Sequence, residues 1–457
     1  LTSLTGDVDP DSFEDETVCK ALGSIRAMRE IQQTNGEAGC NRYIISNNQT
    51  AQNIFEVFAM IRLSEWEAPD VDIVPLFETI PDLEVAVSVM NKVYRNPVYR
   101  EHLTRRGDKQ TIMLGFSDGT KDGGYLMANW SIFKAKEELT AISRKYGINV
   151  AFFDGRGGPP ARGGGNTHQF YASMGNSVEA DEIQLTVQGQ TISSNFGTLD
   201  TCRYNLEQLL SSGISNRLFT SDSSVLNEED RKTMTQLAEV SYEAYKNFKA
   251  HPKFLPYLEH MSTLQYYAKT NIGSRPSKRK SSKTLDFSAL RAIPFVGSWS
   301  QLKQNVPGFF GVGTALESLD KAGDFDKAKQ LYDNNAFFRT LISNSMMSLQ
   351  KSFFKLTAYM EQDPEYGAFW KLIYAEYMRS KDYILKLTEM DSLMEDQPEG
   401  KASIHMREEI VQPLLTIQQY ALLTIQNNKL SAKELDVMEK MVTRSLFGNI
   451  NASRNSA

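Results

Sequence analysis

Short apolar runs alternate with longer amphipathic segments from the early part of the chain to about residue 305. Four of the runs have the length and the branched and aromatic side chains that are typical of buried strands, namely 73–77, 112–116, 148–153 and 289–293. Runs of this kind that alternate with helical segments favour strand-then-helix units and a parallel sheet. The pattern therefore predicts an α/β fold for this part of the chain.

The segments between the runs show helical spacing. Between the second and third runs, apolar residues recur at three- and four-residue steps, at Ile132, Ala135, Leu139 and Ile142. This spacing predicts a helix with one buried face. A second helix is indicated at Asn227, which is a typical helix cap. The three acidic residues that follow it suit the positive end of a helix dipole, and they are Glu228, Glu229 and Asp230.

Beyond about Gly313 the strand-like runs stop, and Leu, Met and aromatic stripes follow helical spacing. These stripes predict the core of a helical bundle, with Pro413 kinking or starting a late helix. We expect an α/β fold in which helix predominates. Its expected parts are a lead-in helical segment, a partial (β/α) barrel that carries the active-site loops, and a helical regulatory region, at 1–40, 41–312 and 313–457.

Composition excludes several classes of protein. Hydrophobic residues make up 41% of the 457 residues, enough for a large core. The net charge of −6 is spread along the chain, so the basic surface that nucleic acid or an anionic membrane requires is not indicated. No apolar run is long enough to cross a bilayer, and three cysteines without metal-type spacing or a secretory leader predict reduced thiols in the cytoplasm. The start at Leu1 rather than Met weakly suggests truncation.

In a parallel α/β fold, functional side chains gather where strands end. Glu78 follows the first predicted strand, and Asp118 and Lys121 follow the second. Glu78 and Asp118 could together hold a hard divalent cation such as Mg²⁺ or Mn²⁺ through oxygen ligands, leaving positions open for a phosphorylated substrate. Alternatively, each carboxylate caps the helix that follows it.

The third predicted strand runs into a glycine-rich loop that contains Arg156 and Arg162. Glycines permit close approach to a ligand, and two guanidinium groups offer forked donors to carboxylate, phosphate or bicarbonate. This favours a mobile lid that closes over an anion. A plain surface loop is an alternative, whereas a disordered nucleic-acid-binding segment does not fit a loop that follows a buried strand in an acidic protein. A second cluster with Arg275 and Arg291 is either another anion site or a solvated basic loop.

Together, these segments resemble phosphoenolpyruvate carboxylase in order, spacing and local sequence from about residue 20 to the end. The segments that carry the resemblance are Pro75-Leu76-Phe77-Glu78-Thr79, Met113-Leu114-Gly115-Phe116-Ser117-Asp118, the double Arg-Gly-Gly loop, Val187-Gln188-Gly189-Gln190, Gly273-Ser274-Arg275-Pro276, Leu290-Arg291-Ala292-Ile293-Pro294 and Arg454-Asn455. The resemblance implies the C-terminal portion of a TIM-type (β/α)8 barrel followed by a large C-terminal helical bundle.

The resemblance also implies an activity. The family is a carbon–carbon lyase that fixes carbon dioxide as bicarbonate: it joins bicarbonate to phosphoenolpyruvate and gives phosphate and oxaloacetate, which replenishes the tricarboxylic acid cycle. It uses Mg²⁺ or Mn²⁺ and no biotin. Carried over to this chain, the metal ligands are Glu78 and Asp118. The residues that bind phosphoenolpyruvate and its departing phosphate are Arg156, Arg275 and Arg291. The catalytic residues are Arg156, together with Lys121 and Arg162, which assist the bicarbonate-derived group.

Family members are commonly homotetramers inhibited by aspartate or malate. The residues matching the inhibitor site are Arg162, Lys351, Arg407 and Asn455. Because Arg162 belongs to both sites, we expect a bound inhibitor to draw the loop away from catalysis.

The chain departs from the family at three places. Asp154 stands where the family usually has His, which sets a carboxylate beside anionic substrates and puts phosphoenolpyruvate affinity in doubt. Pro159-Pro160-Ala161 replaces a more flexible lid sequence, so closure is expected to be stiffer. The loop from Arg275 to Arg291 is also slightly longer than in the family.

The essential upstream histidine of the family, in a Thr-Ala-His-Pro-Thr segment, is absent from the 457 residues. We therefore expect this chain to be inactive alone and to require the N-terminal half of the same polypeptide. Two alternatives stay open: another barrel enzyme that acts on phosphoenolpyruvate or pyruvate, and a non-catalytic metabolite-binding homologue, which Asp154 favours.

Overall fold

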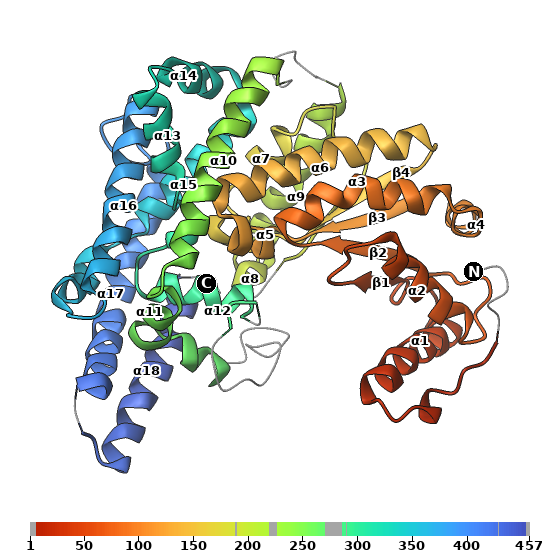
Figure 1. The fold of residues 1–457 in the computed structure, drawn as a ribbon, viewed down its shortest axis with the longest axis horizontal. Helices are drawn as coiled ribbons and strands as arrows, with labels where there is room; N and C mark the ends of the chain where they lie inside the picture. Colours follow the sequence, from red (N-terminus) through yellow and green to blue (C-terminus); the bar gives the residue numbers. More distant parts are fainter. Residues whose placement is uncertain are drawn as a thin grey trace. The chain divides into compact units, whose positions relative to one another are not determined.

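A computed structural model of the chain describes most of its residues (Figure 1), and the described ranges are 6–187, 190–218, 226–269, 286–288, 290–427 and 429–453. The chain divides into two compact units. Unit 1 comprises Leu1–Gly115, Ser131–Gly155 and Asn176–Leu185, and unit 2 comprises Phe116–Trp130, Arg156–Gly175 and Thr186–Ala457. The chain passes from unit 1 to unit 2 after Gly115, Gly155 and Leu185.

Unit 1 contains a five-stranded sheet whose strand order follows the chain. All of its neighbouring strands are parallel, and they are β1 (Arg42–Ile45), β2 (Asp72–Phe77), β3 (Lys109–Leu114), β4 (Asn149–Asp154) and β5 (Ile183–Leu185). Parallel neighbours need crossover connections, and helices supply most of them here. The sheet is therefore built from strand-then-helix units, as the sequence pattern predicts.

The helices of unit 1 (Figure 1) are α1 (Glu16–Asn35), α2 (Ala51–Arg62), α3 (Ile80–Arg95), α4 (Pro97–Arg105) and most of α6 (Tyr125–Lys145). Helices α2 and α3 contact β2 and α4 contacts β3, whereas α1 packs on α2. Helix α3 shows why a helix begins directly after β2. The side chain of Thr79 accepts a hydrogen bond from the backbone of Asp82, whose side chain bonds back to the backbone of Thr79. Pro81 occupies the first turn, where its missing N–H is not needed.

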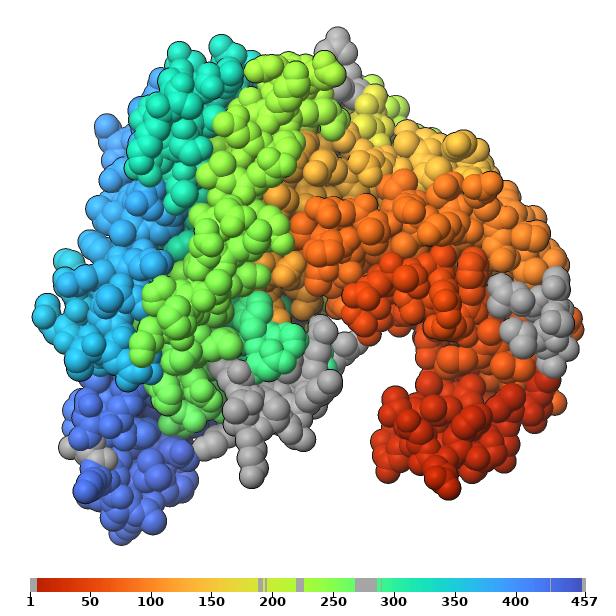
Figure 2. All heavy atoms as spheres, viewed as in Figure 1, coloured from red at the N-terminus to blue at the C-terminus, as the bar shows by residue number. Residues whose placement is uncertain are grey.

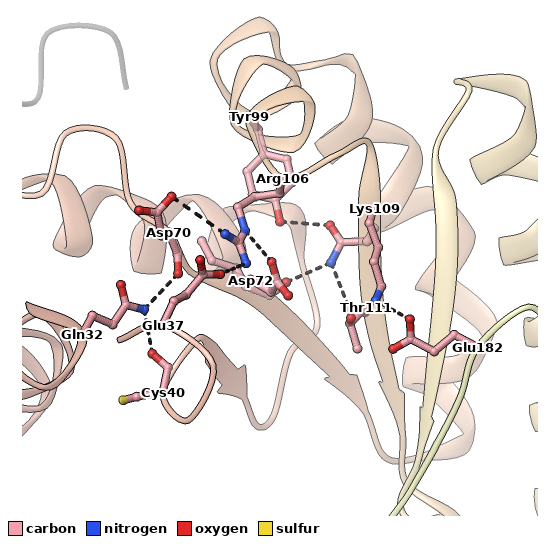
Figure 3. Close-up of polar contacts among 12 residues, drawn as sticks. Gln32, Glu37, Cys40, Asp70, Asp72, Tyr99, Arg106, Lys109, Thr111 and Glu182 are labelled. Carbon is pink, nitrogen blue, oxygen red and sulfur yellow. Dashed lines mark hydrogen bonds and ion pairs between the residues drawn. The ribbon is translucent and has the colours of Figure 1, made fainter. Parts of the chain in front are cut away.

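A cluster of ion pairs ties the starts of the strands together in unit 1 (Figure 3). The Arg106 guanidinium lies 2.8 Å from an oxygen of Asp72, the first residue of β2, and 2.6 Å from a carboxylate oxygen of Glu37. At the same ends of the strands, Lys109 of β3 pairs with Glu182, next to β5. The cluster lies at the amino ends of the strands, where it stabilises the sheet and leaves the opposite ends of the strands unoccupied by these ion pairs.

Unit 2 is helical in its described part. It contains α5 (Phe116–Gly123), α7 (Thr167–Ala172), α8 (Gln190–Phe196), α9 (Leu199–Leu218), α10 (Glu228–Ala250), α11 (Phe254–Met261), α12 (Ala292–Gln301), α13 (Val312–Lys321), α14 (Phe325–Asn334), α15 (Ala336–Gln350), α16 (Gly367–Thr388), α17 (Pro398–Asn427) and α18 (Ala432–Ser453). Aromatic rings dominate its main core. The ring of Phe248 stacks on Phe310 at 4.1 Å and on Phe369 at 5.3 Å between centroids.

Helices α17 and α18 pack together along their length and form the dark-blue lobe of unit 2 in Figure 2. A second core, with Leu422, Val442 and Leu446, lies between them. Pro413 lies inside α17, so it does not start a helix as one of the two sequence interpretations expects. Among the described residues, no helix combines the length and apolarity needed to cross a membrane.

The coarse fold prediction is confirmed as an α/β fold in which helix predominates, with β2, β3 and β4 at the first three predicted runs and α6 at the spacing from Ile132 to Ile142. The Asn227 cap of α10 is confirmed as well, since its side chain accepts a hydrogen bond from the Asp230 backbone.

The predicted strand at 289–293 is wrong at Ala292 and Ile293, which are helical. Helix α12 begins at Ala292, and Arg291 is its cap residue. Residues 290–299 are largely apolar, and such a run does not distinguish a buried strand from a buried helix. Pro294, which looks like a strand terminator, is compatible with the first turn of a helix.

We predict that Arg106→Met destabilises the fold by about 2 kcal/mol, because Asp72 and Glu37 both lose a charged hydrogen-bond partner. The free energy of unfolding in urea measures this change. Arg105→Met is the matched control, since Arg105 pairs with Glu101 on the exposed surface of α4, and such pairs contribute at most about 0.5 kcal/mol. Equal midpoints for the two variants would contradict the assigned role of the cluster.

Candidate active site

The carboxyl ends of four strands are level across the sheet of unit 1. Residues Phe77, Leu114, Asp154 and Leu185 are in register from one strand to the next. The backbone ladder continues one residue further, because Gly115 N–H donates to Phe77 O and Gly155 N–H donates to Leu114 O, both at 2.9 Å. These residues define one edge of the sheet, which we call the carboxyl edge.

Glu78 lies at the carboxyl edge, directly after β2, and is 9% exposed. One of its carboxylate oxygens accepts a hydrogen bond of 3.1 Å from the backbone N–H of Asn47, which follows β1. Close packing also requires Gly115 here, since a Cβ atom at that position would lie 3.0 Å from the Cα atom of Glu78. The neighbouring strands therefore hold this carboxylate in place, and its oxygens suit a hard divalent cation.

Helix α5 of unit 2 carries the next two predicted residues. The negative charge of Asp118 acts on the buried guanidinium of Arg162 and favours its charged form. Lys121 is 8% exposed; its Nζ donates to the Phe287 carbonyl at 2.8 Å and lies 4.4 Å from the Phe287 ring centroid. Glu78 belongs to unit 1 and Asp118 to unit 2, so their sharing of one metal ion stays a prediction. Within the described residues, no group of three or more His, Cys, Asp or Glu is placed to hold a metal ion.

In unit 2, the glycine-rich loop is held by hydrogen bonds between its own residues. Arg156 is 4% exposed, and it donates to the backbone carbonyls of Gly163 at 2.5 Å and Gly164 at 3.1 Å. Its guanidinium lies 4.1 Å from the centroid of the Phe170 ring. Among the described residues, the buried Nη1 of Arg156 has no hydrogen-bond partner. The side chain therefore keeps one donor available to an anion while carbonyls and an aromatic face fix its orientation.

The same loop buries Arg162, which is 1% exposed. Burial lowers the pKa of Arg162 to about 10, and the charge of Asp118 opposes the shift. The loop closes through a hydrogen bond of 2.8 Å from Gly157 N–H to Arg162 O. Only glycine fits at Gly163, where φ is +73° and a Cβ atom would lie 2.3 Å from Cβ of Phe116. Two arginines are thus held in one compact loop.

A second cluster of cations surrounds a cavity of about 60 Å³ in unit 2. Lys351 and Arg407, two of the predicted inhibitor contacts, line it together with Lys303 and Glu408. Lys303 and Glu408 form an ion pair of 2.5 Å. Burial lowers the pKa of Lys351 to about 8, and repulsion from Lys303 and Arg407 lowers it further, whereas Glu408 opposes the shift. Three cations and one carboxylate therefore line the same cavity.

Residues of the glycine-rich loop and of the C-terminal end of the described chain also line the cavity. Pro159, Pro160 and Ala161 form part of its wall, next in sequence to Arg162, and Ser453 lies on another side. The predicted contact Asn455 and the predicted substrate ligand Arg275 both lie outside the described residues. The Val187-Gln188-Gly189-Gln190 and Gly273-Ser274-Arg275-Pro276 segments lie wholly or partly outside them as well.

The sequence does not predict three lysines that pack beside these elements. Lys303 lines the cavity, Lys136 pairs with Asp154, and Lys249 of α10 binds the backbone carbonyl of Asp122, next to Lys121. Lys249 also lies 5.2 Å from the centroid of the Phe287 ring. No motif marks a lysine that acts through a distant partner, so only the packing of the folded chain identifies these residues.

Comparison with known proteins agrees with this arrangement. The sequence profile of the phosphoenolpyruvate carboxylase family matches residues 8–453. The chain is 34% identical over 421 residues to a protein named phosphoenolpyruvate carboxylase from Corynebacterium diphtheriae, and the match covers 89% of this chain and 46% of that relative. The chain thus spans about half the length of this relative, and by both matches it belongs to the phosphoenolpyruvate carboxylase family.

Proposed function

We propose that the complete protein containing this chain joins bicarbonate to phosphoenolpyruvate and releases oxaloacetate and phosphate. The observation that carries the proposal is the buried Arg156 loop in a chain that matches the carboxylase family from residue 8 to residue 453. A guanidinium binds the oxygens of a phosphate or carboxylate in pairs, and phosphoenolpyruvate carries both groups.

Each proposed catalytic residue has a role in offsetting negative charge. Arg156, with Arg275 and Arg291, binds phosphoenolpyruvate and the phosphate that departs from it. Lys121 and Arg162 assist the bicarbonate-derived group as carboxyphosphate and the enolate form. The Phe170 ring and the loop carbonyls exclude water around Arg156, which strengthens its interaction with developing charge.

Glu78 and Asp118 are the proposed ligands of Mg²⁺ or Mn²⁺. Carboxylate oxygens are the donors that these cations prefer, and two of them leave positions for water and substrate oxygens. When bound, the metal supplies Lewis-acid stabilisation of the phosphate and enolate oxygens. No biotin is required by this scheme.

The finer features of the fold belong to the same proposal. The five parallel strands form the C-terminal portion of a (β/α)8 barrel, which occupies the predicted barrel region at 41–312. Residues 1–40 lead into it, and the helices of 313–457 form the regulatory region. The other half of the polypeptide completes the barrel and supplies the missing histidine. The assembly is a cytoplasmic homotetramer, as is common in the family, and its product replenishes the tricarboxylic acid cycle.

The cavity beside Lys351 is proposed to bind aspartate or malate as an inhibitor. Lys351 and Arg407 would pair with the two carboxylates together with Arg162 and Asn455. The wall segment Pro159–Ala161 belongs to the loop that holds Arg156, so an occupant of the cavity contacts the catalytic loop. Another barrel enzyme that acts on phosphoenolpyruvate or pyruvate would not need this cation cluster, and we therefore place it second.

A non-catalytic metabolite-binding homologue is the remaining alternative, and Asp154 is the feature that favours it. This carboxylate is paired with Lys136, so it does not present an unbalanced negative charge. The pairing weakens the argument for lost turnover.

We predict bicarbonate-dependent formation of oxaloacetate by the complete protein with Mg²⁺ or Mn²⁺, and none by the 457-residue chain alone. Glu78→Gln and Asp118→Asn should each lower kcat/KM at least about a hundredfold, because each removes a proposed metal ligand. Glu84→Gln, on the exposed face of α3, is the control with unchanged activity. Turnover by the isolated chain, or full activity of both ligand variants, contradicts the proposal.

We predict that L-aspartate raises the melting temperature of the 457-residue chain in a saturable manner, because a ligand that binds only the folded state stabilises it. Lys351→Ala and Arg407→Ala should abolish the shift. Lys355→Ala, at an exposed position four residues further along, should retain it. If the folded chain shows no shift, the cavity of this chain is not the inhibitor site on its own.

The low pKa of Lys351 gives the inhibitor site a pH dependence. Anion binding favours the charged ammonium, so malate affinity should be greatest below about pH 8 and fall by up to tenfold per pH unit above it. Malate is the probe because it has no amino group to titrate, and melting curves with and without it at each pH give the affinity. Lys351→Arg keeps its charge at pH 9, so its affinity should be equal at pH 7 and pH 9. A flat profile in the unmodified chain would exclude Lys351 as a malate contact.

A further inference from the structure

A buried ion pair joins α6 to the carboxyl end of β4 within unit 1. Lys136 Nζ lies 2.7 Å from Asp154 Oδ2, and the two side chains are 2% and 1% exposed. Lys136 Nζ also lies 5.2 Å from the centroid of the Phe152 ring. Phe152 and Asp154 are two residues apart on the strand, so they point to the same side of the sheet. Lys136, on α6, therefore packs over the last residues of β4 on this face of the sheet.

Each of the two buried charges is stabilised by the other. A buried ammonium or carboxylate that loses its partner destabilises a protein strongly, whereas replacing both by neutral groups is often nearly neutral. Asp154 is also the residue that stands where the family resemblance implies His. The structure thus shows a carboxylate at this position together with a lysine that balances it.

The pair lies at the point from which the arginine loop departs. Asp154 is in register with Leu114 of β3 and Leu185 of β5, and Gly155 N–H continues the ladder to Leu114 O. Arg156 is the next residue along the chain. A single residue, Gly155, therefore separates the end of β4 from Arg156.

We propose that Lys136 is a positioning residue for the anion-binding loop. It holds Asp154 against the helix layer, cancels the negative charge at the end of β4, and so fixes the strand end from which Arg156 extends. Its effect on catalysis rests on the proposed carboxylase function, whereas the coupling of the two charges does not.

The coupling is tested in the 457-residue chain by urea unfolding of Lys136→Met, Asp154→Asn and the double variant. Each single variant should raise the unfolding equilibrium constant about a hundredfold or more, and the double variant should raise it less than either single variant. Lys136→Arg keeps the charge and should retain most of the stability. Additive effects of the two single substitutions overturn the pairing.

The positioning role is tested by steady-state kinetics of the complete protein. Lys136→Met should raise KM for phosphoenolpyruvate at least about tenfold with a smaller change in kcat, because Asp154, two residues before Arg156 in the chain, then loses the ammonium that pairs with it. The double variant Lys136→Met with Asp154→Asn should return KM to within about threefold. Lys145→Met, at the exposed end of α6, is the control with unchanged KM.

The substitution Asp154→His restores the residue that the family usually has. It distinguishes this proposal from the opposite one, in which Asp154 itself weakens the binding of phosphoenolpyruvate. Asp154→His alone leaves Lys136 buried beside a neutral or cationic ring, so it should weaken phosphoenolpyruvate binding rather than improve it. A lower KM for Asp154→His, or an unchanged KM for folded Lys136→Met, overturns the positioning role. Absence of turnover in the unmodified complete protein would instead refute the carboxylase function and, with it, the catalytic role of Lys136, while the unfolding cycle still decides the pairing.

Discussion

The arrangement of the site depends on the backbone ladder at the carboxyl edge of the sheet. Gly115 and Gly155 each donate to the last residue of the preceding strand, so the strand ends stay level and the chain leaves both strands from fixed positions. Side chains are poorly tolerated there: a Cβ atom at Gly115 would lie 3.0 Å from Cα of Glu78, and one at Gly155 would lie 3.1 Å from the Leu114 carbonyl oxygen. Helix α5 and the arginine loop begin at the next residues, so these two backbone bonds set where each of them starts.

The second constraint is the cost of burying charge. Lys136, Arg156 and Lys303 are all less than a tenth exposed, and a buried cation without a partner is strongly unfavourable. The chain uses different solutions for them. Lys136 and Lys303 each pair with a carboxylate, which fixes structure, whereas Arg156 is held by carbonyl dipoles and an aromatic face. Dipoles orient a guanidinium without cancelling its charge, so Arg156 stays attractive to an anion.

The sequence predicts the elements that have a clear period or a clear boundary. Strands β2 to β4 are short apolar runs bounded by polar residues, and α10 begins at a polar cap followed by acids, so local chemistry is sufficient for both. The run that leads into α12 is largely apolar, and nothing in its composition separates a strand from a buried helix. The residue types of the arginine loop were also recognisable, because glycines and arginines directly follow a strand. Lys136 and Lys303 were not recognisable, since each acts through a partner far away in the sequence.

The two prolines of the arginine loop fit the hydrogen-bond pattern of that loop. Pro159 O accepts from the N–H groups of Arg162 and Gly164, and Pro160 O accepts from Gly163 N–H, so the loop uses the carbonyls of both prolines and needs no N–H from either. Proline at such positions restricts the unfolded chain and leaves the folded loop with few alternative shapes. The segment Pro159–Ala161 lines the cavity, and Gly157 N–H donates a hydrogen bond to Arg162 O. A ligand that displaces the cavity wall would therefore also displace the start of the loop beside Arg156. The proposed inhibition therefore requires only that the ligand prefer one of two positions of this loop.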